Sequence, residues 1–169
     1  RLHHLGWKGD LREQVSAVGG DMAMRHGIIL AKSIPAKKYR IQTGESILEA
    51  KQKCPNLILV PPNYGLYERC SKAFMGILQE YSPVVEQYSI DEAFVDMTGT
   101  ELLWGTPVEV AEKMRRQIKE RLGFTVNIGI SENKLLAKMA SDFQKPDRVH
   151  TLWKSEIRNK MWPLPVSDL

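Results

Sequence analysis

The chain has 169 residues, of which 43% are hydrophobic and 26% are charged, proportions that are ordinary for a globular protein. No apolar run approaches the roughly 18 residues that a membrane-spanning helix needs, and no signal peptide opens the chain, so we expect a cytoplasmic protein without a membrane partner. The formal net charge of +4 is compatible with a polyanionic partner.

Charge is distributed unevenly along the chain. Acidic residues outnumber basic ones in 63–123, whereas basic residues are in excess in 21–53 and in 124–169. A metal site beside a phosphate-binding surface would have this arrangement. Cys54 and Cys70 form no CxxC pair, so we expect no zinc site and expect both thiols to serve as small hydrophobic side chains.

The first third of the chain predicts a small α/β subdomain. Pro35 stands at a plausible first helical position, Pro55 ends a helix, and Pro61 ends a buried strand. In chain order the predicted elements are an irregular segment at 1–14, a short apolar run at 16–19, a strand at 26–33, a helix at 34–39, a helix at 46–53 and a strand at 57–60.

From residue 63 onward, helical and strand-like patterns alternate. Apolar residues recur every three or four positions between Asn63 and Tyr81, which is the spacing of an amphipathic helix. Thr106 and Glu109 form a capping box, and Gly123 is a natural helix stop. The predicted elements are a helix at 63–81, hairpin strands at 84–85 and 93–95, a helix at 106–122, a strand at 124–130, a helix after 131 and an edge strand at 149–153.

The helix after residue 131 is predicted to have two distinct sides. Ser131 is expected to cap it. Lys134 and Lys138, four residues apart, share one side. The apolar residues are expected to face inward on another side: Leu135, Leu136 and Met139.

The stretch YSIDEAFVD at 88–96 places two carboxylates next to each other. Asp91 and Glu92 lie between two short strand-like runs, so we expect them in the turn of a hairpin. Adjacent anions repel each other, and a folded protein keeps them together only where water screens them or cations bind. The spacing alone leaves two interpretations open, an exposed acidic turn and a metal site.

The order helix, strand, strand, helix, strand from residue 63 predicts a ferredoxin-like α+β fold with one strand missing at its front. In such a fold two long helices cover one face of an antiparallel sheet. The acidic turn would then lie at the end of the sheet, where a bound metal would be partly open to substrate.

Several ordered segments carry a resemblance to a known family. They are HGIILAKSIPAKKYRIQTGESILEAKQKCPNLILVPPNY at 26–64, YSIDEAFVD at 88–96, NIGISENKLLAKMASDFQKP at 127–146 and PLPVSDL at 163–169. With them, residues 11–169 resemble the Y-family, or lesion-bypass, DNA polymerases, the UmuC/DinB-like (ImpB/MucB/SamB) group. The resemblance implies a ferredoxin-like palm plus a small α/β fingers subdomain. Its parts are an irregular segment at 1–14, fingers at 15–62, a palm at 63–152 and the lead-in to an absent thumb at 153–169.

The resemblance also implies a metal site. Nucleotidyl transfer joins a primer hydroxyl to the α-phosphorus of a nucleoside triphosphate, and two Mg²⁺ ions roughly 4 Å apart can stabilise the attacking and the leaving oxygen. Hard cations of this size take carboxylate oxygens. By resemblance, Asp91 and Glu92 would be catalytic metal ligands, Asp91 toward both ions and Glu92 toward the ion that activates the primer.

Four lysines receive roles from the same resemblance. Lys37 in the fingers and Lys145 in the palm would clamp the triphosphate as point charges. Lys134 and Lys138 would face the DNA backbone, with a salt-dependent contribution to affinity. The implied partners are a DNA primer-template, deoxynucleoside triphosphates and a sliding clamp bound through segments outside this chain. The implied setting is DNA repair in the SOS response, in the cytoplasm at the bacterial nucleoid.

The chain departs from the family in two places. Ile34 stands where many members carry a tyrosine that touches the triphosphate, and Lys37 stands where an arginine is usual, so the planar two-pronged grip is lost. Members also begin with a central palm strand whose aspartate bridges both metals. Asp10 and Glu13 are the only candidates here, in the wrong pattern, so we expect the third carboxylate to be missing.

The leading interpretation is a translesion DNA polymerase in a truncated form with little activity of its own. Because the chain opens with Arg1, a processed or truncated product is expected. One alternative is a non-catalytic remnant that binds nucleic acid or a partner. Another is a palm-type nucleotide cyclase, since that chemistry can also run on a palm-like sheet with paired carboxylates. The context of Gly19-Gly20-Asp21 argues against it, because Met22 and Ala23 follow where acidic and aromatic residues should stand.

Overall fold

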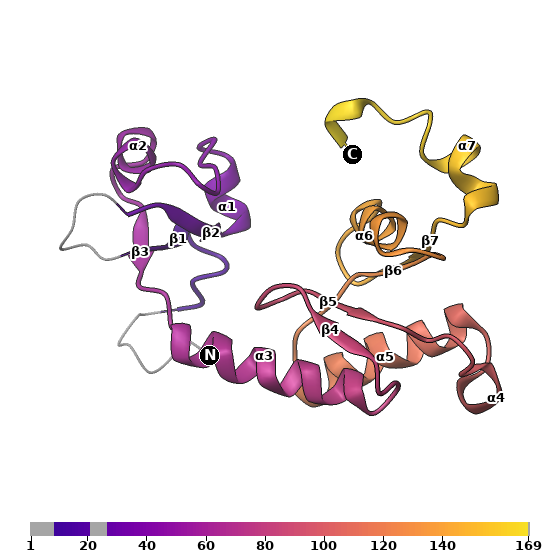
Figure 1. Ribbon diagram of the computed structural model, residues 1–169. Coiled ribbons are helices and arrows are strands. Elements are labelled where there is room, and N and C mark those ends of the chain that lie inside the picture. The colour runs from indigo at the N-terminus through magenta and orange to yellow at the C-terminus, as the bar shows by residue number, and fades with distance from the viewer. Residues whose placement is uncertain (1–8, 21–26, 169) are drawn as a thin grey trace. The chain divides into compact units, whose positions relative to one another are not determined.

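The computed structural model describes residues 9–20 and 27–168. It divides into two compact units, residues 1–64 and residues 65–169 (Figure 1). Most of the segment predicted to be irregular lies outside the described residues, as do His26 of the predicted strand and the cyclase-like residues 21–23. The division into fingers, palm and thumb lead-in stays a prediction.

Three short strands form the sheet of the first unit. Central β1 (Ser16–Gly19) pairs antiparallel with β2 (Ile29–Lys32) and parallel with β3 (Ile58–Val60). A parallel pair needs a long connection between its strands. Two helices lie in that connection, α1 (Ile34–Lys37) and α2 (Ile47–Lys53).

Side-chain caps fix where the two helices of the first unit begin. Ser33 caps α1, which begins at Ile34 as predicted, so Pro35 is the second helical residue and not the first. Ser46 and Glu49 form a capping box at the start of α2, a signal that is visible in the sequence.

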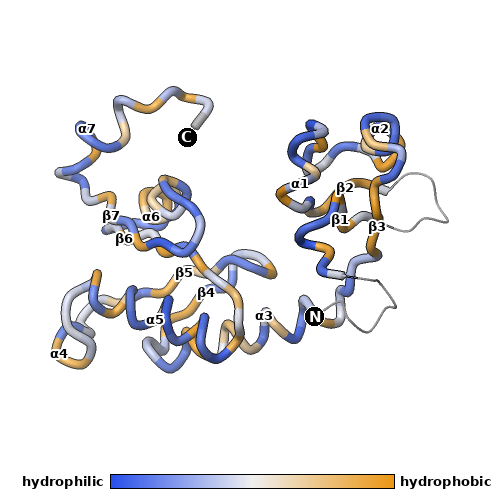
Figure 2. Tube along the Cα trace, turned by 180° about the vertical axis from the view of Figure 1, so that it is seen from behind, coloured by the Kyte–Doolittle hydropathy of each residue, from blue (hydrophilic) through white to orange (hydrophobic). Residues whose placement is uncertain are grey.

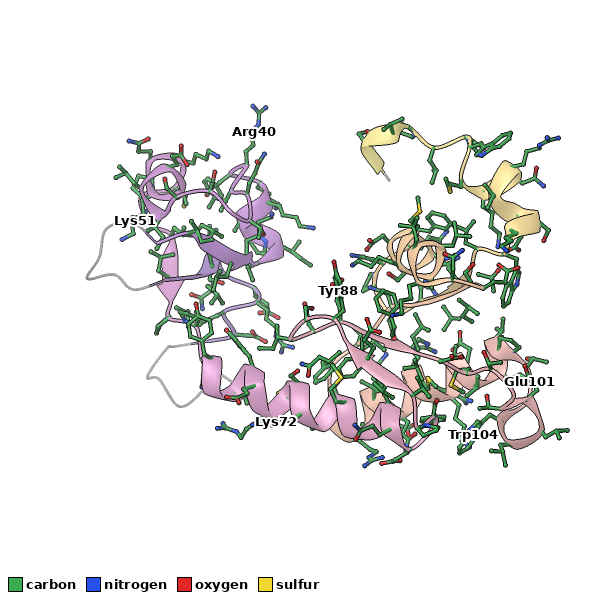
Figure 3. All side chains as sticks on the ribbon, viewed as in Figure 1. Arg40, Lys51, Lys72, Tyr88, Glu101 and Trp104 are labelled. Carbon is green, nitrogen blue, oxygen red and sulfur yellow. The ribbon has the colours of Figure 1, made fainter. Side chains whose placement is uncertain are left out.

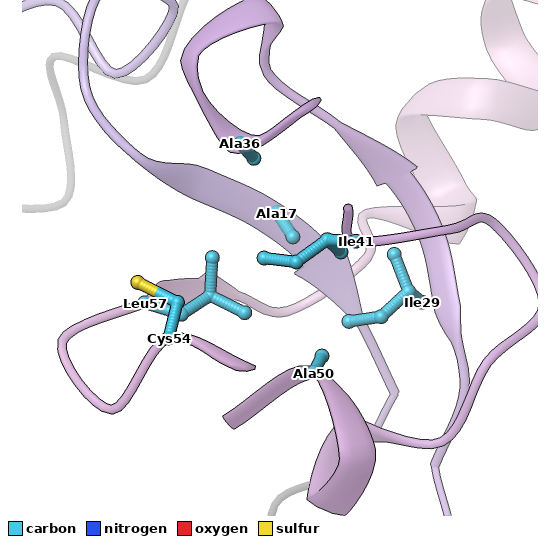
Figure 4. Close-up of a cluster of buried hydrophobic side chains, with 7 residues drawn as sticks. All are labelled: Ala17, Ile29, Ala36, Ile41, Ala50, Cys54 and Leu57. Carbon is cyan, nitrogen blue, oxygen red and sulfur yellow. The ribbon is translucent and has the colours of Figure 1, made fainter. Parts of the chain in front are cut away.

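The core of the first unit is made of small and branched side chains. Strands, helices and the loops between them point these side chains toward one another in Figure 4, and the strands are among the hydrophobic segments of this unit in Figure 2. Cys54 is buried in this core as a free thiol, in agreement with its expected role. The cluster consists of Ala17, Ile29, Ala36, Ile41, Ala50, Cys54 and Leu57.

The second unit is built on two long helices and a hairpin. Helix α3 (Tyr64–Gln79), which begins at the last residue of the first unit, leads into β4 (Val85–Gln87) and β5 (Ala93–Val95), which pair antiparallel. A short α4 (Glu101–Trp104) then connects to α5 (Pro107–Leu122). Helices α3 and α5 lie along one side of the hairpin in both views (Figures 1 and 2).

One core joins these elements. Ile77 and Leu78 of α3 pack with Met114 and Ile118 of α5, and all four are buried. The inward side chains of the hairpin strands and of the segment after α5 cover this cluster: Val85, Ala93, Val95, Phe124, Val126 and Ile128. The predicted α+β class, with two helices on one face of the strands, is confirmed.

The ends of α5 follow the predicted signals. Thr106 Oγ1 accepts a hydrogen bond from the backbone N–H of Glu109 at 3.3 Å, and Glu109 Oε2 accepts one from the backbone N–H of Thr106 at 2.8 Å. At the other end Gly123 adopts a φ of 75°, a left-handed conformation that favours glycine.

The last strands depart from the single antiparallel sheet that was predicted. β6 (Ile128–Ile130) and β7 (Val149–Thr151) pair parallel with each other, separately from β4 and β5. The reason is α6 (Lys134–Asp142), which forms the crossover between β6 and β7 and so makes them parallel. The ladder begins only at Ile128, although the strand was predicted from residue 124.

Two predictions about α6 were wrong. Its N-cap is Asn133, whose Oδ1 accepts a hydrogen bond from the backbone N–H of Leu136 at 2.9 Å, whereas the Ser131 hydroxyl donates to the backbone oxygen of Leu152. Leu135 was expected to face inward and is 70% exposed. Leu136 is buried as predicted, together with Ala140 one turn further on, and Leu135 lies about 100° around the helix from Leu136.

The chain continues into short helices. Their bounds are Lys154–Glu156 (η3), Ile157–Lys160 (α7) and Val166–Asp168 (η4). Across 9–20 and 27–168, no helix is long and apolar enough to cross a membrane.

Gly129 generates a stability prediction, because α6 passes directly over it. A Cβ added there would lie 1.9 Å from the carbonyl oxygen of Ala137 and 2.5 Å from the backbone nitrogen of Ser141. We expect Gly129→Ala to lower the free energy of unfolding by about 1–3 kcal/mol, since the helix must shift. Urea denaturation measures this change.

Gly76 in α3 is the matched control, because an added Cβ meets nothing within 4 Å. Gly76→Ala is expected to raise the free energy of unfolding by about 0.5–1 kcal/mol through helix propensity. Effects of the same sign and size at both positions would contradict the close packing of α6 on β6.

Candidate metal and nucleotide site

The turn of the β4-β5 hairpin is closed by backbone hydrogen bonds. The carbonyl oxygen of Glu92 accepts from the N–H of Tyr88 at 2.9 Å and from the N–H of Ser89 at 3.0 Å. Asp91 is exposed in this turn and Glu92 is half-buried at its end. The structure thus places both predicted ligands at a hairpin turn, as expected.

A chain of polar contacts supports Asp91. The Ser89 hydroxyl donates to Asp91 Oδ1 at 2.9 Å, and Gln87 Nε2 donates to the backbone oxygen of Ser89 at 3.1 Å. Gln87 Nε2 also donates to the hydroxyl of Ser71, a buried residue of α3, at 3.3 Å. Asp91 is therefore linked to α3 through the turn.

An aromatic pair flanks the same turn. The rings of Tyr88 and Phe94 meet edge to face with centroids 5.7 Å apart. Tyr88 projects away from the hairpin ribbon in Figure 3 and is 63% exposed. This pairing stiffens the hairpin next to the acidic residues.

The predicted DNA-facing lysines contact the hairpin itself. Lys138 donates a hydrogen bond to Glu92 Oε1, and Lys134 donates one to Glu86 Oε2 on β4. The hydrogen bond to Glu92 raises the pKa of the Lys138 ammonium above its ordinary value. Sequence reasoning missed both pairs, because the lysines lie 46 and 48 residues from their partners along the chain.

Lys145 lies on the loop after α6, where its Nζ is 2.6 Å from Asp142 Oδ1. The same loop is tied to α5 by Asp147, whose carboxylate accepts from Lys119 Nζ at 2.7 Å and Arg115 Nη1 at 2.6 Å. Lys119 and Arg115 hold the pKa of the Asp147 carboxyl below its ordinary value. Sequence reasoning missed Asp147, because its partners lie far away along the chain.

The remaining predicted contacts belong to the first unit. Lys37 is exposed in the last turn of α1, and Ile34 is 76% exposed at its start. The role of Lys37 at a triphosphate stays a prediction. Asp10, a candidate third ligand, accepts a hydrogen bond from the Arg12 side chain at 2.9 Å, and Glu13 is exposed.

Metal-ligand geometry is incomplete in the part of the chain that the structure describes. No group of three His, Cys, Asp or Glu side chains lies close enough together there to hold a metal ion. Asp91 and Glu92 are two carboxylates of the kind that hard cations prefer, and their role as metal ligands stays a prediction.

A sequence model of the impB/mucB/samB family matches residues 6–142. A DNA polymerase IV of Clostridium acetobutylicum is 52% identical to this chain over 160 residues, which cover 95% of the chain and 40% of the relative. A DNA polymerase IV of Acetivibrio thermocellus is 42% identical over 160 residues, with the same coverage of 95% and 40%. The chain spans about 40% of the length of these curated relatives.

Two solved structures that are similar to this chain are named DinB and Dbh DNA polymerase. DinB from Sulfolobus solfataricus matches with a TM-score of 0.80 at 27% identity, over 94% of this chain and 46% of that chain. An insertion ternary complex of Dbh DNA polymerase matches with a TM-score of 0.79 at 27% identity, over 94% and 47%.

The Asp147 contacts predict a pH dependence of stability. The pKa of Asp147 is lowered in the folded protein, so its ionised form stabilises the fold above the unfolded-state pKa. This contribution is lost as pH falls through the folded-state value. We expect Asp147→Asn to lower the urea midpoint at about pH 7 and the difference from the unsubstituted chain to be smaller at about pH 3.

Glu80 provides the control, because its pair with Arg121 also involves α5 and both side chains are about half exposed. Glu80→Gln is expected to change the midpoint less, since water screens an exposed pair. A difference for Asp147→Asn that stays the same at both pH values would contradict the ionic role of this carboxylate.

Proposed function

The chain belongs to the impB/mucB/samB family, and on this premise we propose that it is the fingers-and-palm part of a template-directed DNA polymerase of the translesion type. The observation that carries this proposal is the hairpin turn, which presents Asp91 and Glu92 between two strands that pack against α3 and α5. Relatives named DNA polymerase IV support the same reaction.

Asp91 and Glu92 are the proposed catalytic metal ligands. A pair of Mg²⁺ ions bound there would stabilise the attacking primer oxygen and the leaving oxygen. The two side chains fit this role in donor type, because both offer carboxylate oxygens. They do not complete it, since the described residues contain no third ligand beside them. A further carboxylate has to come from outside the described residues.

The lysines serve the substrates in this proposal. Lys145, on the loop that Asp147 ties to α5, binds the triphosphate, as does Lys37 from the fingers. Lys134 and Lys138 bind the DNA backbone when they leave their present carboxylate partners. Their contribution to DNA affinity then falls as salt rises.

The activity of the whole protein is proposed from longer relatives. The chain spans about 40% of their length. The proposed partners are a primer-template, deoxynucleoside triphosphates and a sliding clamp. The proposed setting is the SOS response at the bacterial nucleoid.

The incomplete ligand set predicts that the 169-residue chain alone is a poor catalyst. We expect negligible Mg²⁺-dependent primer extension, because two carboxylates without a third leave the ions poorly held. Extension of a labelled primer by the purified chain measures this. Robust extension that is lost in Asp91→Ala would contradict the expectation of a deficient site.

A second candidate function is non-catalytic binding of nucleic acid, which the incomplete ligand set favours. Binding and extension of the same primer-template distinguish the polymerase from the non-catalytic function. Salt-sensitive binding of the primer-template without any extension favours the non-catalytic remnant. Weak extension that is lost both in Asp91→Ala and in Glu92→Gln favours the polymerase.

A further inference from the structure

Helix α6 meets the acidic hairpin through two lysines. Lys138 donates a hydrogen bond to Oε1 of Glu92, and Lys134 donates one to Oε2 of Glu86. The lysines are four residues apart and are therefore neighbours on one face of the helix. Lys134 Nζ also lies 5.6 Å from the centre of the Phe94 ring, which attracts cations.

The two ion pairs differ in their surroundings. The side chains of Lys138 and Glu92 are each 38% exposed, whereas those of Lys134 and Glu86 are 60% and 56% exposed. Water and salt screen the first pair less, so Lys138 acts more strongly on its partner. Glu86 is outside the proposed ligand pair, so the second ion pair is an internal reference for the first.

Lys138 balances the charge of the hairpin turn. Asp91 and Glu92 are adjacent anions, and a nearby cation offsets their repulsion. A divalent ion on Glu92 needs carboxylate oxygens, one of which Lys138 engages. The divalent ion would also bring two positive charges close to the Lys138 ammonium. The ammonium and the metal ion therefore compete for one carboxylate.

We propose that Lys138 is the resident counter-cation of the acidic hairpin, which holds Glu92 while no metal is bound and releases it when a divalent ion binds. This inference rests on the proposed function, because it takes Asp91 and Glu92 as metal ligands. It gives Lys138 a role in setting the metal affinity of the site, separate from any contact with DNA.

Mn²⁺ binding to the purified chain tests this role without catalysis, since free Mn²⁺ is measured directly by its EPR signal. Lys138→Met keeps the apolar stem and removes the charge, and we expect it to bind Mn²⁺ about two- to fivefold more tightly. Lys138→Arg keeps the charge and is expected to bind no more tightly than the unsubstituted chain. Lys134→Met is the matched control and is expected to leave the affinity nearly unchanged.

Unchanged or weaker Mn²⁺ binding by a folded Lys138→Met variant would overturn the proposal. The Asp91→Asn and Glu92→Gln variants locate the site. If both bind Mn²⁺ as well as the unsubstituted chain does, the proposed metal site fails and the role of Lys138 fails with it. If both lose binding while Lys138→Met is unchanged, only the role of Lys138 fails.

A second measurement needs no substitution. In ¹⁵N spectra of the unsubstituted chain, added Mg²⁺ is expected to move the Nζ signal of Lys138 and to leave that of Lys134 in place. Equal movement of both signals, or movement of neither, would count against the release of Glu92.

Discussion

The packing of α3 against α5 is the constraint on which the second unit depends. Ile77 and Leu78 meet Met114 and Ile118 in one buried cluster, and the inward side chains of β4, β5 and β6 cover it. The hairpin strands are short, so a ladder of this length would be marginal without that support. Because the core holds the strands, the turn between them can present two carboxylates to solvent.

Charge is the second constraint, and it acts at the turn. Asp91 and Glu92 repel each other, and the structure answers this with a hydroxyl donor at Asp91 and an ammonium donor at Glu92. Both partners come from supported elements, Ser89 from a turn linked to α3 and Lys138 from α6. The proposed metal site and the contacts that hold the turn together without metal thus use the same carboxylates.

Local signals in the sequence predicted most of the elements, but they could not predict the long-range contacts. The capping box of Thr106 and Glu109 and the stop at Gly123 depend on neighbours within one turn, so the bounds of α5 were predictable. The orientation of Leu135 and the parallel pairing of β6 with β7 depend on how α6 packs, which no single segment encodes. For the site, the turn position of Asp91 and Glu92 could be predicted from the strand-like runs on either side of them. Their hydrogen-bond partners could not all be predicted, because Lys138 lies 46 residues from Glu92 along the chain.

The central claim is that the hairpin turn binds a divalent metal ion, and paramagnetic broadening by Mn²⁺ tests it most directly. At substoichiometric Mn²⁺, amide signals of residues 88–92 are expected to disappear first, while those of α4, which follows the far end of β5, remain. The double variant Asp91→Asn, Glu92→Gln is expected to abolish this local broadening. Broadening centred elsewhere, or unchanged broadening in the double variant, would contradict a metal site at the hairpin.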